Sequence, residues 1–83
     1  MLDVESLARH NAATVILMND AVKAAEFMYK SVERGLASGD QEEKTAITKY
    51  VISIMEAVSE FDMKYADKIA AEYIRLLKRS MHP

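Results

Sequence analysis

The sequence predicts an all-α fold, an antiparallel bundle of three helices that forms a single domain over residues 1–83. Apolar residues recur at steps of three and four through most of the chain, which is the spacing of one face of a helix. Helix breakers are scarce, because the chain holds only 2 glycines and 1 proline. A chain of 83 residues is also long enough for one small core and too short for two.

The first helix is expected over about residues 3–35. Its apolar stripe is interrupted at Asn11, and a second apolar line runs beside the stripe. A face this wide is typical of a helix that packs against two neighbours. The stripe comprises Val4, Ala8, Val15, Met18, Val22, Ala25, Tyr29, Val32 and Leu36, and the second line comprises Leu7, Leu17, Ala21, Ala24 and Met28.

A corner is expected after this helix, around Gly35 and Gly39. Either glycine can adopt the left-handed conformation that ends a helix, and Asp40 can cap the next one. Glu43 follows Asp40 by three residues, at the acidic position of a capping box. The second helix is therefore expected over about residues 41–60.

The second half of the chain carries an apolar stripe with a slip in its spacing near Tyr65. Asp62 can cap a third helix over about residues 63–81, and we favour this break because an unbroken helix would extend roughly 60 Å, beyond the reach of the first helix. Glu60 and Lys64 oppose it, since they are spaced as a helical ion pair. Without the break, the chain would be a long helical hairpin that dimerises into a four-helix bundle.

Charge and composition exclude several classes of function. The chain has 11 basic and 13 acidic residues and a net charge of -2, which does not favour nucleic-acid binding. Neither an apolar stretch of about 20 residues nor the layout of a signal peptide is present, so no membrane span is expected. The absence of cysteine excludes disulfides and suits a reducing cytosol. We therefore expect a soluble cytoplasmic protein.

Residues with catalytic or metal-binding chemistry are not clustered in the sequence. His10 and His82 lie near opposite ends, and neither has another histidine or a cysteine at ligand spacing. Glu56 and Glu60 are expected to be solvated charges and not a catalytic pair, because nothing near them in the sequence would desolvate them. We expect no metal, no cofactor and no enzymatic activity.

The chain carries more large apolar residues than so small a core can enclose. Part of this surplus is expected to face a partner, either an amphipathic helix lying in a groove or a second copy of the chain as a homodimer. The surplus residues are Leu17, Met28, Ile52, Met55, Phe61, Met63, Ile74 and Leu77.

Several short apolar and turn segments, which together involve about two-thirds of the chain, form a further pattern. They are Ile16-Leu17-Met18, Asp20-Ala21-Val22, Gly39-Asp40-Gln41-Glu42-Glu43-Lys44, Val51-Ile52-Ser53-Ile54-Met55 and Ser59-Glu60-Phe61-Asp62-Met63 with Ile69, Ala70 and Tyr73. In this order the segments resemble the flagellar export chaperones that hold flagellin before secretion. Asn19 departs from the family's pattern, which has an aromatic residue at this position. The resemblance implies a helical bundle whose outer apolar grooves accept helices of an unfolded export substrate.

The predicted function is that of a non-catalytic helix-binding protein, similar to an export chaperone or an adaptor. One alternative is an oligomeric structural or regulatory protein that uses the same face for self-association, and another is a helical bundle resembling bacteriocin immunity proteins. The expected binding positions, which can equally be core, are Ile47, Val51, Ile54, Met55, Val58, Tyr65, Ile69, Tyr73 and Leu76.

Overall fold

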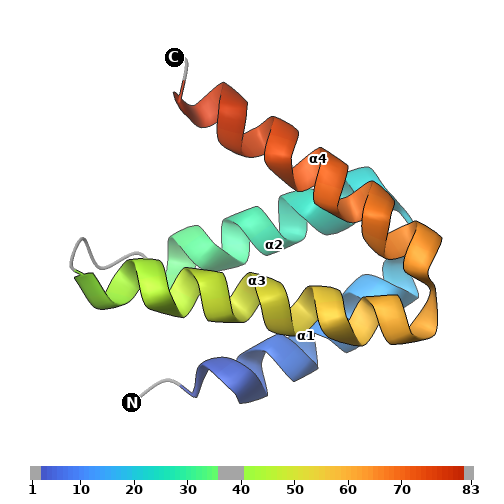
Figure 1. Cartoon of the computed structure of the whole chain (residues 1–83), viewed down its shortest axis with the longest axis horizontal. Coiled ribbons are helices and arrows are strands. Elements are labelled where there is room, and N and C mark those ends of the chain that lie inside the picture. Colours follow the sequence, from blue (N-terminus) through green and yellow to red (C-terminus); the bar gives the residue numbers. More distant parts are fainter. Residues whose placement is uncertain (1–2, 36–40, 82–83) are drawn as a thin grey trace.

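The computed structural model describes residues 3–35 and 41–81. These residues form four helices, α1 (Val4–Met18), α2 (Ala21–Gly35), α3 (Gln41–Phe61) and α4 (Met63–Met81) (Figure 1). No strand occurs in either described range, so the all-α class is confirmed. The corner predicted at Gly39 and Asp40 lies outside the described residues. None of the four helices is both long and apolar enough to cross a membrane.

The prediction of one continuous first helix, and with it the three-helix count, is wrong. Asn19 has φ 49° and ψ 41°, in the left-handed region, and it ends α1. Asn is one of the few residues other than Gly that adopts this conformation at low cost. Asp20 then caps α2, because its Oδ1 accepts a hydrogen bond from the Lys23 N–H at 3.1 Å and its carbonyl accepts one from the Ala24 N–H at 2.8 Å.

The turn between α3 and α4 lies at Asp62, where the sequence favours a break. The Asp62 Oδ1 accepts a hydrogen bond from the Tyr65 N–H at 3.2 Å, and the Asp62 carbonyl accepts one from the Ala66 N–H at 3.0 Å. The Asp62 N–H itself donates to the Val58 carbonyl at 2.8 Å, which completes the last turn of α3. The unbroken second helix of the hairpin alternative is therefore not formed.

The four helices form two layers, each a V-shaped pair joined by a short turn (Figure 1). α1 packs mainly on α3, and α2 packs mainly on α4. α1 and α3 run in the same direction across the view, as do α2 and α4. Helices that follow one another in the chain run in opposite directions, as predicted, but the pairs that pack across the layers do not. The Cα atoms occupy a slab of 33 × 32 × 15 Å.

The core lies between the two layers. α1 contributes Val15 and the small side chains of Ala8 and Ala12, whereas α3 contributes the larger Tyr50 and Ile54 together with Val58. Small residues on one helix leave room for larger ones on its neighbour, which keeps the interior close-packed. α2 and α4 add Ala24, Ala25, Met28, Val32, Tyr65, Ala66, Ile69 and Tyr73.

Three hydrogen bonds satisfy the polar groups of Asn11 and of two core tyrosines. Asn11, which interrupts the predicted stripe, is buried, and its side-chain amide donates to the Tyr50 hydroxyl at 2.7 Å. The Tyr65 hydroxyl donates to the Val15 carbonyl and accepts from the Asp20 N–H at 3.3 Å. These contacts join α3 to α1 and α4 to the α1–α2 turn.

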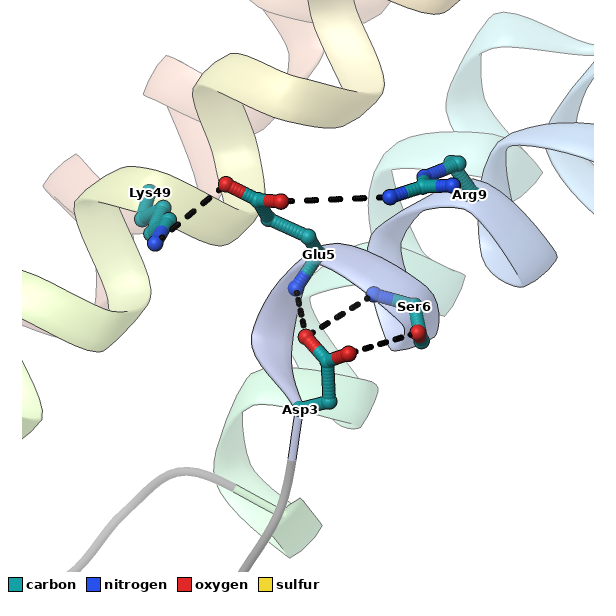
Figure 2. A network of polar contacts seen from close by, with 5 residues as sticks. All are labelled: Asp3, Glu5, Ser6, Arg9 and Lys49. Atoms are coloured by element: carbon teal, nitrogen blue, oxygen red, sulfur yellow. Dashed lines mark hydrogen bonds and ion pairs between the residues drawn. The ribbon is translucent and has the colours of Figure 1, made fainter.

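A surface network fixes the start of α1 and links it to α3 (Figure 2). The Asp3 Oδ1 accepts hydrogen bonds from the backbone N–H groups of Glu5 at 3.1 Å and Ser6 at 3.3 Å. The Ser6 hydroxyl donates to Asp3 Oδ2 at 2.8 Å, and this bond lowers the pKa of Asp3 below its ordinary 3.8. Glu5 lies between two cations, at 3.4 Å from Lys49 of α3 and 3.8 Å from Arg9.

Candidate functional site

α3 and α4 diverge from the turn at Asp62 (Figure 1). An apolar groove lies between them. Its volume is about 350 Å³, and its lining is almost entirely apolar. We call it the α3–α4 groove. It is lined by Ile47, Thr48, Val51, Ile52 and Met55 of α3 and by Ala70, Tyr73, Ile74 and Leu77 of α4.

The large side chains at the rim of the groove are exposed. Ile52 and Ile74 are each 51% exposed and Leu77 is 40% exposed, on opposite sides of the opening. Tyr73 is buried at the groove wall, with its ring 6.2 Å from that of Tyr29 of α2. The groove is therefore built on core residues and presents branched aliphatic side chains to the outside. Clustered apolar surface of this kind makes the groove the candidate site on the described residues.

The groove continues beyond its apolar centre at both ends. Toward the Asp62 turn, a shallower depression shares Val51, Ile52, Met55 and Ala70 with the groove and adds Glu56, Ser59, Ala66 and Asp67. At the opposite end, Thr48 also lines a depression formed with Lys44, Thr45 and Lys49. We call the groove and these two depressions together the furrow. The furrow has an acidic end at Glu56 and Asp67, an apolar centre and a basic end at Lys44 and Lys49.

The predicted binding residues divide between the groove and the core. Ile47, Val51, Met55 and Tyr73 line the groove. In contrast, Ile54, Val58 and Ile69 are fully buried core residues, and Tyr65 is nearly so, with its hydroxyl bonded to α1. These four are not groove residues, because they face the opposite layer and not the opening between α3 and α4. Leu76 is half-buried in a separate cavity against α2.

The groove also contains residues that are not among the predicted binding positions, namely Thr48, Ile52, Ala70, Ile74 and Leu77. Three of these residues, Ile52, Ile74 and Leu77, belong to the surplus of large apolar residues in the sequence. The expectation that part of this surplus stays outside the core is confirmed. Met28 is the exception, since it is fully buried, and Met55 is half-buried. The exposed members of the surplus are Leu17, Ile52, Phe61, Met63, Ile74 and Leu77.

A second, smaller cavity of about 170 Å³ lies between α2 and α4. Its lining includes Glu26, Glu72, Arg75 and Arg79. The Arg75 guanidinium donates to both carboxylate oxygens of Glu72, at 3.1 and 3.2 Å, so these two charges neutralise each other. This cavity holds an internal ion pair and offers less apolar surface than the α3–α4 groove.

The groove offers binding surface and little acid–base chemistry. Its one titratable lining residue is Tyr73, whose pKa is raised above the ordinary 10.0 by burial and, to a lesser degree, by nearby Tyr50 and Tyr29, so its hydroxyl stays neutral near pH 7. Within residues 3–35 and 41–81, no group of three or more His, Asp or Glu side chains could hold a metal ion. His10 is exposed on α1, and His82 lies outside the described residues.

The arrangement is therefore suited to burying the apolar side chains of another molecule, with charged groups at both ends of the binding surface to contact it. Similarity to known proteins adds nothing to this description. No family model, no curated protein and no solved structure matches this chain.

Proposed function

We propose that this protein is a non-catalytic helix-binding protein, an export-chaperone-like protein or an adaptor, that holds an amphipathic helix of a partner protein in the α3–α4 groove. The observation that carries the proposal is the exposure of Ile52, Ile74 and Leu77 around an apolar opening of about 350 Å³. We further propose that it acts in the cytosol, which its cysteine-free composition suits.

The dimensions of the groove fit a helix. Its α3 wall, together with that of the depression toward the Asp62 turn, extends from Ile47 to Ser59, which corresponds to roughly 18 Å at about 1.5 Å per residue. A helical occupant of about three turns would match this length and would insert residues at positions i, i+4, i+7 and i+11. Because isolated helices of this length are marginally stable in water, the occupant is expected to be part of a longer helix or to fold on binding.

Self-association remains the second candidate, because a separate set of apolar residues is exposed at the two turns. Leu17 is 85% exposed, Phe61 65% and Met63 66%. Leu17 lies near the α1–α2 turn, and Phe61 and Met63 flank the α3–α4 turn, at the same edge of the slab (Figure 1). Sedimentation of the wild-type chain and of Leu17→Asp and Ile74→Asp variants tests whether either surface forms a dimer.

The proposed function is tested by identifying helices that bind wild-type protein and fail to bind the Ile74→Asp variant, with Leu17→Asp as the matched control outside the groove. Retention of an export substrate from a flagellated bacterial lysate, lost only in Ile74→Asp, would support the narrower flagellar chaperone proposal. Retention of no export substrate would contradict that narrower proposal. Wild-type protein that binds no amphipathic helix at all would contradict helix binding itself.

A further inference from the structure

We infer that the occupant of the α3–α4 groove is an amphipathic helix with acidic residues at its N-terminal end and basic residues at its C-terminal end, lying parallel to α3. This inference rests on the proposed function and specifies the partner's charge layout and direction. It follows from the placement of charged residues at the two ends of the furrow.

The ends of the furrow differ in charge. Lys44 and Lys49 lie at the end where α3 begins, and Lys49 is already paired with Glu5 at 3.4 Å. Lys44 is exposed and is the cation nearest the start of the groove along α3. At the other end, Glu56 and Asp67 are both exposed and face the same depression from α3 and α4. A bound helix is therefore favoured when its acidic end lies over Lys44 and its basic end lies over Glu56 and Asp67.

The direction of the bound helix follows from its own stability. Acidic residues stabilise a helix at its N-terminus and basic residues at its C-terminus, because they compensate the helix dipole. A partner helix with this usual layout satisfies both ends of the furrow only if its N-terminus lies over Lys44. Since α3 also begins at this end, the partner runs parallel to α3 and opposite to α4. In the opposite direction, the negative C-terminal end of the partner's helix dipole would lie over Lys44, which is favourable. Its basic side chains would then also lie over Lys44, and repulsion between these full charges is the larger effect.

The test uses a synthetic amphipathic peptide of about 18 residues, with leucines at i, i+4, i+7 and i+11, glutamates in the first turn and lysines in the last. One version carries a photoreactive residue at its N-terminus and the other carries it at its C-terminus. Cross-links to the protein are mapped by mass spectrometry. We expect the N-terminal label to react near Lys44 and Thr48, and the C-terminal label near Ser59 and Asp67, each with about a tenfold preference that decreases as added salt screens the charges.

A charge-reversed protein, Lys44→Glu combined with Glu56→Lys, should invert this preference while keeping the helix content seen by circular dichroism. Lys68→Glu is the matched control, since Lys68 is exposed on α4 and does not line the furrow, and it should change nothing. Equal labelling at both ends by a peptide that binds in the groove would overturn the inference and leave the proposed function standing. Absence of groove cross-links, or a dimer that Ile74→Asp dissociates, would overturn both.

Discussion

The buried Asn11 side chain donates a hydrogen bond to the Tyr50 hydroxyl at 2.7 Å, across the interface between α1 and α3. Tyr50 is fully buried and Asn11 is 6% exposed, so water cannot replace either hydrogen-bonding partner if the other is removed. An unpaired buried polar group is costly, so a packing of α1 on α3 that breaks this bond would destabilise the fold.

The Tyr50→Phe variant is expected to lower the free energy of unfolding by about 1–3 kcal/mol, because the Asn11 amide loses its acceptor inside the core. Urea denaturation followed by circular dichroism measures this change. Combining Tyr50→Phe with Asn11→Leu removes both partners and should recover part of the loss. A single variant as stable as the wild-type protein would show that water reaches the Asn11 amide.

Asn19 should be sensitive to substitution because its φ of 49° is unfavourable for most residues. Asn19→Ala is expected to destabilise the protein by about 1 kcal/mol, whereas Asn19→Gly should be neutral or stabilising, since glycine adopts the left-handed conformation freely. Thermal unfolding of the two variants beside the wild-type protein makes the comparison. Equal stability of Asn19→Ala and Asn19→Gly would contradict the left-handed conformation at this position.

The same residue shows why periodicity predicted one helix in place of two. Val15, Met18 and Val22 keep steps of three and four across the turn, so the apolar pattern contains no trace of the break. The local signal is the Asn19-Asp20 pair, a residue tolerant of the left-handed conformation followed by a capping residue. In the second half of the chain, by contrast, the spacing of the apolar residues slips near Tyr65. Together with Asp62 as a capping residue, this slip was sufficient to favour the break between α3 and α4.

The groove was predictable only as a surplus of apolar residues. A stripe such as Val51, Ile54 and Val58 shows which face of a helix is apolar, but not which part of that face a neighbour will cover. The stacking of the two layers decides this, because Ile54 and Val58 become core while Val51 stays half-buried in the groove. That stacking depends on contacts between residues far apart in the sequence, such as Asn11 with Tyr50.

Tyr73 should make the protein less stable in alkali. Its pKa is raised mainly by burial, so above about pH 10 the unfolded chain ionises first and gains stability relative to the folded one. The stabilising contribution is complete below pH 10 and is lost as the pH rises through the folded-state pKa. Tyr73→Phe should therefore flatten the fall in urea midpoint above about pH 10. Parallel curves for the two proteins would contradict this.

Ile69 and Ile74 form a matched pair of positions for comparing the core with the groove, since both are isoleucines on α4. Ile69 is fully buried, so Ile69→Asp would place a carboxylate in the core and should unfold the chain, with loss of the helical circular dichroism signal.

Ile74 is 51% exposed in the groove, so the charge in Ile74→Asp remains solvated. This variant should keep its helix content and lie within about 1 kcal/mol of wild-type stability. Binding of an amphipathic peptide should nevertheless weaken by at least about tenfold, because the bound state would desolvate the new carboxylate beside apolar side chains. Titration calorimetry measures the affinity. A folded Ile74→Asp protein that binds the peptide as tightly as the wild type would show that the helix docks elsewhere.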